Sequence, residues 1–165
     1  GEYFHNRKQW GDSYRHCLPI RNTAMQGPFK YEKRYKYPHL TEGEAEIWER
    51  FVKKYPDYFD EVWYDVEVGT CRDGTKTPNP AYEAHKEYLN KYKIDVLGKK
   101  GGTTTIVEVK KHATSTALGE IQLYFHCYLR DFPTQGLLKT MILTDIEMPD
   151  MKEITELDDT QLVIV

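Results

Sequence analysis

Two carboxylates and a lysine are the residues of this chain whose types and spacing could do chemistry. Asp95 precedes the tripeptide Glu108-Val109-Lys110. Neighbouring carboxylates repel each other, and a hard cation such as Mg²⁺ or Mn²⁺ between them removes that repulsion while it keeps waters for substrate phosphates. A lysine beside them can orient or help deprotonate an attacking water and offset charge that develops on phosphorus. The combination indicates hydrolysis of a phosphodiester.

A β-hairpin is expected to position these residues. Strand patterns cover residues 93–98 and 103–110, and a turn is expected over residues 99–102. Because an isolated Glu-x-Lys is a common tripeptide, the alternative is a solvated hairpin with an incidental Glu–Lys pair on its wet face.

Side-chain alternation predicts one charged face and one buried face for this hairpin. Glu108 and Lys110 are expected to point the same way. A symmetric turn places Asp95 opposite Ile106, which makes it a diagonal neighbour of Glu108. The buried face is expected to hold the β-branched residues Ile94, Val96, Val107 and Val109.

Other elements are expected around the hairpin in a definite order. The patterns predict a helix over residues 41–55, a strand over 61–68, a loop over 69–80 with a short inserted helix over 80–92, the hairpin, a helix over 117–130, a strand over 137–143 and a terminal strand over 161–165. Without the insertion, the order is helix, three strands, helix, strand.

The first predicted helix carries a further acidic residue. Thr41 and Glu44 have the spacing of a capping box, in which the glutamate bonds back to the start of the helix. Helical spacing places several residues on one face: Glu44, Trp48, Phe51, Val52 and Tyr55. Glu44 therefore lies on the apolar stripe of this helix.

These residues together resemble the PD-(D/E)XK nuclease superfamily over roughly residues 41–145. Asp95 matches the aspartate of the motif, and Glu108 and Lys110 match its (D/E)XK element. Ile94 stands where the motif name has proline. The resemblance implies an α/β, restriction-endonuclease-like fold with an αβββαβ core, in which a central mixed sheet is flanked by helices.

The resemblance also implies a metal site. Asp95, Glu108 and the carbonyl of Val109 would hold one or two Mg²⁺, with Mn²⁺ as a substitute. Glu44 is the candidate for a further ligand, because the first helix of the superfamily often supplies one. Since a capping-box glutamate already has a structural role, both interpretations of Glu44 stay open.

The remaining catalytic candidates are Lys110 and Gln122. Lys110 would position the attacking water, and Gln122, expected on the core-facing side of helix 117–130, would orient the lysine or a phosphate. The exonuclease branch of the superfamily usually has a tyrosine four residues after such a glutamine, whereas this chain has His126. By resemblance, in-line attack would leave a 5′ phosphate.

Composition indicates one soluble domain. A chain of 165 residues is long enough to bury a core, and a mean hydropathy of −0.71 with 30% charged residues favours a soluble protein. No apolar run reaches the length of a membrane span. Three scattered cysteines form no zinc pattern or disulfide framework, which favours a reducing, intracellular setting.

Charge is distributed unevenly along the chain. The net charge is −3, yet residues 1–39 carry eight Lys or Arg against three Asp or Glu, and residues 140–165 carry one against seven. Residues 1–40 are therefore expected to form an extended basic, aromatic arm in front of a nuclease-like domain over residues 41–165. The residues expected to contact nucleic acid are Lys30, Lys33, Arg34, Lys36, Lys111 and His112. Alternatively, the arm packs on its own domain, or on a partner protein, by its tyrosines.

The sequence therefore predicts a metal-dependent nuclease that acts on DNA, with endonucleolytic and exonucleolytic action and RNA substrates left open. The alternative is a nuclease fold recruited as a structural or assembly component, for example of a viral or mobile-element particle. In that case the arm would mediate a homo-oligomer or a larger complex, and cleavage would be weak or absent.

Overall fold

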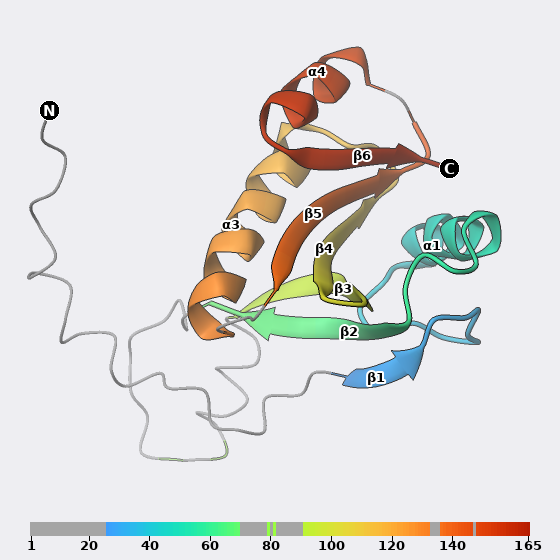
Figure 1. Ribbon diagram of the computed structural model, residues 1–165, viewed down its shortest axis with the longest axis vertical. Helices are drawn as coiled ribbons and strands as arrows, with labels where there is room; N and C mark the ends of the chain where they lie inside the picture. Colours follow the sequence, from blue (N-terminus) through green and yellow to red (C-terminus); the bar gives the residue numbers. More distant parts are fainter. Residues whose placement is uncertain (1–25, 70–78, 80, 82–90, 133–135, 147) are drawn as a thin grey trace, which may run out of the picture. The chain divides into compact units, whose positions relative to one another are not determined.

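The computed structural model describes residues 26–69, 79, 81, 91–132, 136–146 and 148–165 (Figure 1). The elements, in chain order, are β1 (Gln26–Lys30), α1 (Glu42–Lys54), β2 (Glu61–Val68), β3 (Tyr92–Lys100), β4 (Thr103–Lys110), α3 (Ser115–Asp131), β5 (Leu137–Thr144), α4 (Pro149–Leu157) and β6 (Thr160–Ile164). All of them belong to one compact unit, residues 24–69 and 92–165. The inserted loop and helix predicted over residues 69–92 lie mostly outside the described residues.

The strands form one mixed, open sheet of six strands in the order β1-β2-β3-β4-β5-β6. The pairs β1–β2, β2–β3 and β3–β4 are antiparallel, and the pairs β4–β5 and β5–β6 are parallel. α3 is the crossover between the parallel strands β4 and β5, as such a connection requires. The chain is therefore an α/β protein, and the predicted order of helix, three strands, helix and strand is observed from α1 to β5.

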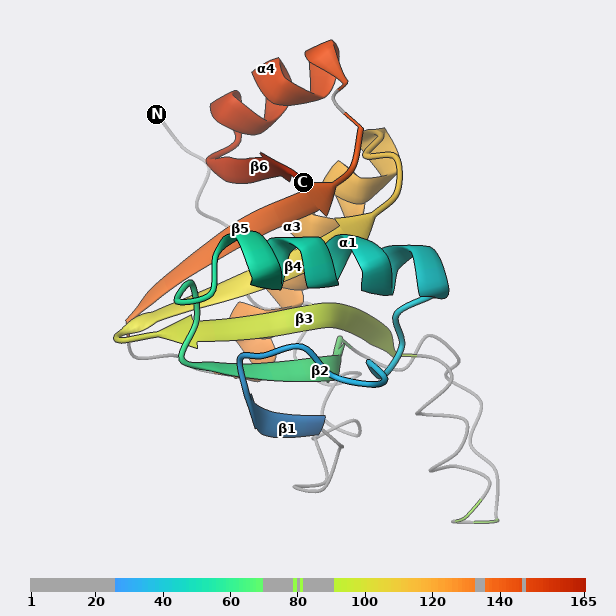
Figure 2. The same cartoon turned by 90° about the vertical axis from the view of Figure 1, so that its right-hand side faces the viewer.

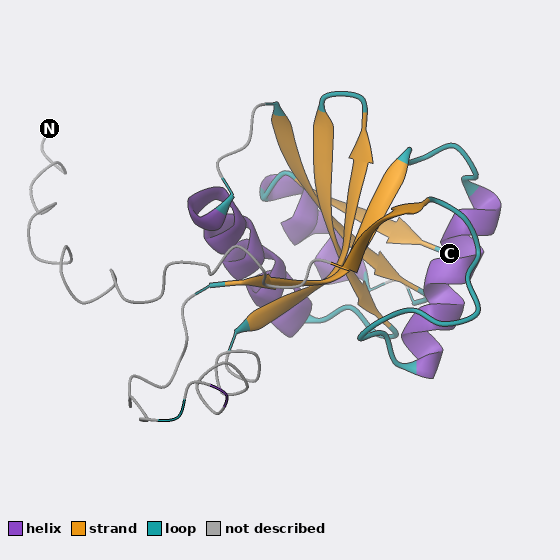
Figure 3. Ribbon diagram, turned by 90° about the horizontal axis from the view of Figure 1, so that it is seen from below, coloured by secondary structure: helices purple, strands orange, loops and turns teal. Residues whose placement is uncertain are grey.

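Helices cover both faces of this sheet (Figures 2 and 3). α1 packs on one face through a stripe of buried side chains: Ile47, Trp48, Phe51 and Val52. α3 and the buried Met151 of α4 pack on the other face. Each face of β3 and β4 therefore meets a helix, which argues against the alternative of a solvated hairpin with a wet face.

The hairpin register also differs from the prediction. Leu97, not Asp95, pairs with Ile106, and Lys100 pairs with Thr103. The loop thus contains only Gly101 and Gly102. Gly101 has φ +55°, a conformation that glycine adopts at no steric cost, so the turn is tighter than expected.

Two strands change face at an aspartate. Tyr64 belongs to the core under α1, whereas Val66 belongs to the core under α3. Side chains two apart on a regular strand share a face, so β2 must turn over between them, at Asp65 with φ +52°. On β3, Ile94 and Val96 were predicted to share one buried face. Val96 instead belongs to the core under α1 and Ile94 to the core under α3, on either side of Asp95. Ile94 therefore packs under α3, contrary to the prediction.

Part of the predicted N-terminal arm belongs to the domain. β1 pairs with β2, and Tyr31 and Tyr37 are buried in the core under α1. The boundary expected at residue 40 is therefore wrong for residues 26–40, where the tyrosines pack on the chain's own domain. Residues 1–25 lie outside the described part.

The core under α1 contains a buried hydrogen bond that can be tested. Trp48 Nε1 donates to the Tyr64 hydroxyl at 3.0 Å, and both side chains are fully buried. We expect Tyr64→Phe to lower the free energy of unfolding by about 1–3 kcal/mol, because it leaves the indole N–H without a partner. Tyr58→Phe is the matched control, since its hydroxyl bonds Gln161 at the surface, and it should change stability by less than about 0.5 kcal/mol. Equal effects of the two variants in urea titrations would contradict this account.

Candidate active site

The candidate site lies where β3 and β4 separate. The last paired residues of the two strands are Val96 and Val107. Farther along β4, the N–H of Val109 donates to Asp95 Oδ2 at 2.9 Å. The Asp95 carboxylate thus replaces a backbone acceptor at the point where the ladder opens, and its position is tied to β4.

Glu108 and Lys110 meet beside this opening. Lys110 Nζ lies 2.8 Å from Glu108 Oε1 and 3.1 Å from Glu120 Oε2 of α3. The Glu108 side chain is 1% exposed, and its second oxygen, Oε2, is buried with no hydrogen-bond partner. Lys110 therefore orients the Glu108 carboxylate and leaves its buried Oε2 without a hydrogen-bond partner.

Burial makes ionisation of the two carboxyls unfavourable. It raises the pKa of Asp95 to about 7; the charge of Glu44 adds to the shift and the N–H of Val109 opposes it. Burial, and then the charge of Asp95, raises the pKa of Glu108 to about 9. Burial lowers the pKa of Lys110, but its ion pairs with Glu108 and Glu120 outweigh this effect and raise that pKa above its ordinary value. Lys110 is thus held as a cation.

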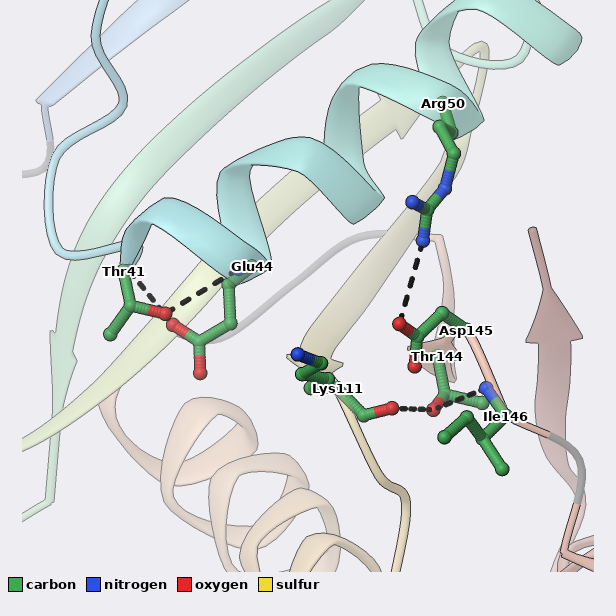
Figure 4. A network of polar contacts seen from close by, with 7 residues as sticks. All are labelled: Thr41, Glu44, Arg50, Lys111, Thr144, Asp145 and Ile146. Atoms are coloured by element: carbon green, nitrogen blue, oxygen red, sulfur yellow. Dashed lines mark hydrogen bonds and ion pairs between the residues drawn. The ribbon is translucent and has the colours of Figure 1, made fainter.

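Glu44 has the structural role that its spacing predicts. Its Oε2 accepts from the N–H of Thr41 at 2.9 Å, and Thr41 accepts in return from the N–H of Glu44, which completes the capping box (Figure 4). Its charge nevertheless contributes to the raised pKa of Asp95. The N-terminus of α1 therefore lies near the opening, and both interpretations of Glu44 fit its place.

Two carboxylates, Asp95 and Glu108, could hold a divalent cation here without a full protein cage. Within the described ranges, no three His, Cys, Asp or Glu side chains are arranged to hold a metal ion. Mg²⁺, however, is usually bound by one or two carboxylates and completes its shell with water and substrate phosphates. The open oxygen of Glu108 and the mutual repulsion of Glu108 and Asp95 are what such an ion would satisfy.

Gln122 does not reach the site. It is exposed on α3 and donates to Asp158 Oδ2. The buried stripe of α3 consists of Ala117, Ile121, Tyr124, Cys127 and Tyr128. The sequence pattern predicted a stripe of Leu118, Ile121, Phe125 and Leu129, with Gln122 on the same face. The observed stripe is rotated from it, so Leu129 is half exposed and the expectation of a core-facing glutamine was wrong.

Glu120 takes the place at Lys110 that was expected of Gln122. It lies three residues after Ala117 and four before Tyr124, and therefore on the side of α3 that faces the sheet. Helical spacing would have identified it once the buried stripe was known. The predicted stripe pointed to the wrong residue.

The predicted basic residues fall into two groups. The first group contacts other residues of the domain. Lys30 pairs with Glu32 at 3.1 Å, and Lys33 pairs with Glu49 at 2.7 Å. The Arg34 guanidinium lies 3.9 Å from the centre of the Phe29 ring. Three further side chains are exposed: Lys36, Lys111 and His112. Lys111 and His112 directly follow Lys110, and the Lys111 carbonyl accepts from Thr144 at the adjacent end of β5 (Figure 4).

Comparisons with models of protein families, with curated proteins and with solved structures give no match to this chain. What the fold and site define is an α/β protein whose described part holds a six-stranded mixed sheet and a buried pair of carboxylates. None of the helices in the described ranges is long and apolar enough to span a membrane.

The raised pKa values predict that stability falls as pH rises. Between about pH 4, where unfolded carboxyls titrate, and about pH 7, the folded chain keeps a proton on Asp95 that the unfolded chain releases. We expect the free energy of unfolding of Asp95→Asn, relative to wild type, to rise by at least about 1 kcal/mol from pH 5 to pH 8 in EDTA. The exposed Asp57→Asn serves as control, and a pH-independent difference for Asp95→Asn would contradict the buried-charge account.

Proposed function

We propose that this chain is a divalent-metal-dependent nuclease of the PD-(D/E)XK type that hydrolyses phosphodiester bonds in DNA. The observation that carries this proposal is the Glu108 carboxylate, which is buried beside Asp95 with one oxygen on Lys110 and the other without a partner. A structural ion pair does not require a second buried carboxylate, because adding one raises the energy of the charged state.

The arrangement of the elements supports the same proposal. The order α1, β2, β3, β4, α3, β5 is the order that the superfamily core requires, with the acidic residues on β3 and β4. The site also adjoins the carboxyl ends of the parallel strands β4 and β5. Ligands of open α/β sheets commonly bind outside the carboxyl ends of the strands.

Each side chain then has a chemical role. Asp95 and Glu108 would hold the cation, with the Val109 carbonyl and Glu44 as further candidate ligands. When bound, the cation would polarise a phosphoryl oxygen and neutralise developing charge. Lys110, kept protonated by two carboxylates, would donate to the attacking water or to a phosphate oxygen rather than accept a proton. Lys111 and His112, which are exposed and directly follow Lys110, would contact the substrate backbone.

Binding of a cation should appear as a gain in stability without any substrate. We expect Mn²⁺ or Mg²⁺ at one hundred times its Kd to stabilise the chain by about 2.7 kcal/mol, which raises Tm by roughly 5–10 °C. Asp95→Asn and Glu108→Gln should lose this shift, and Asp57→Asn should retain it. A wild-type Tm that neither Mn²⁺ nor Mg²⁺ changes would count against a metal site.

Cleavage itself is tested with plasmid, linear and branched DNA in Mg²⁺ or Mn²⁺. We expect wild type to nick or degrade at least one of these substrates, and Lys110→Ala to lower kcat by about 10²–10³, the usual effect of removing one donor to developing charge. Lys152→Ala, on the exposed surface of α4, is the matched control. If Lys110→Ala cleaves as wild type does, Lys110 has no part in the reaction. A protein that uses the fold only for assembly would cleave nothing and gain no stability from cations.

A further inference from the structure

Glu120 of α3 contacts the lysine of the site from a different element. Lys110 Nζ lies between Glu108 Oε1 at 2.8 Å and Glu120 Oε2 at 3.1 Å. Glu108 and Lys110 lie on one strand, whereas Glu120 belongs to the crossover helix. The lysine is therefore fixed by two elements, and its position depends on how α3 packs against β4.

The two ion pairs differ in exposure. The Lys110 and Glu120 side chains are 31% and 33% exposed, whereas Glu108 is 1% exposed. Lys110 and Glu120 therefore form the accessible side of the site, and Glu108 lies beneath them. The Lys110 ammonium on Oε1 of Glu108 repels a cation that binds Oε2 of the same carboxylate. A second carboxylate that holds Lys110 draws its ammonium away from Glu108 and weakens that repulsion.

We propose that Glu120 is a positioning residue that shares Lys110 with Glu108 and thereby keeps Glu108 able to bind a cation. This inference rests on the proposed nuclease function. Glu120 acts through Lys110, so its effect on the cation disappears when Lys110 is absent. Glu120 would also keep the lysine ammonium in place when a cation is bound to Glu108.

Four proteins in a double-mutant cycle test the proposal: wild type, Glu120→Gln, Lys110→Ala and the double variant. The Mn²⁺ concentration at half-maximal thermal stabilisation is measured without DNA, and kcat and KM for plasmid cleavage are measured with it. We expect Glu120→Gln to raise the Mn²⁺ midpoint and to lower kcat by about 10- to 100-fold, as is typical for residues that orient a ligand or a catalytic group. In the Lys110→Ala background, Glu120→Gln should leave the Mn²⁺ midpoint unchanged.

Glu153→Gln is the matched control, since Glu153 is an exposed glutamate on α4. It should leave both the midpoint and kcat unchanged. If Glu120→Gln still raises the Mn²⁺ midpoint in the Lys110→Ala background, Glu120 attracts the cation directly and the positioning role is overturned. Wild-type values of the midpoint and kcat for Glu120→Gln itself would also overturn it. If wild type cleaves no DNA in either metal, the proposed function fails and this inference fails with it; if wild type cleaves and Glu120→Gln is unaffected, the inference alone fails.

Discussion

The hydrogen bond from the Val109 N–H to the Asp95 carboxylate is the interaction on which the site depends. It occurs just beyond the last backbone pair of β3 and β4, where a regular ladder would supply a carbonyl acceptor instead. A buried N–H without a partner costs about 1–3 kcal/mol, so the strands can separate here only because a side chain replaces the missing carbonyl. The buried carboxylates of Asp95 and Glu108 lie at this end of the ladder.

Carboxylates outnumber cations around Lys110. The pKa values of Asp95 and Glu108 are raised by burial, and Glu44 and Glu120 add negative charge to the surroundings of a single lysine. Such an arrangement lowers stability at neutral pH, which a core of purely apolar residues would avoid. A divalent cation would offset the negative charge of these carboxylates, which is the reason for the metal-dependent reaction proposed above.

Much of the fold follows from local patterns. The capping box at Thr41 begins α1 as expected, β2 has the predicted bounds, and the crossover from β4 through α3 to β5 keeps its predicted order. Local patterns did not reveal β1 or α4. The segment containing β1 reads as basic and aromatic because its tyrosines, not a run of aliphatic residues, are what it buries.

The sequence by itself determined the order of the elements from α1 to β5 and the grouping of Asp95, Glu108 and Lys110, because side-chain periodicity, helix capping and motif spacing act over a few residues. Tertiary structure decided the rest. The hairpin register moved by two residues, Ile94 and Val96 separated onto opposite faces, and Glu120 rather than Gln122 met Lys110. These outcomes depend on which residues distant in sequence pack together, and in particular on two strands that turn over at aspartates, so no local period encodes them.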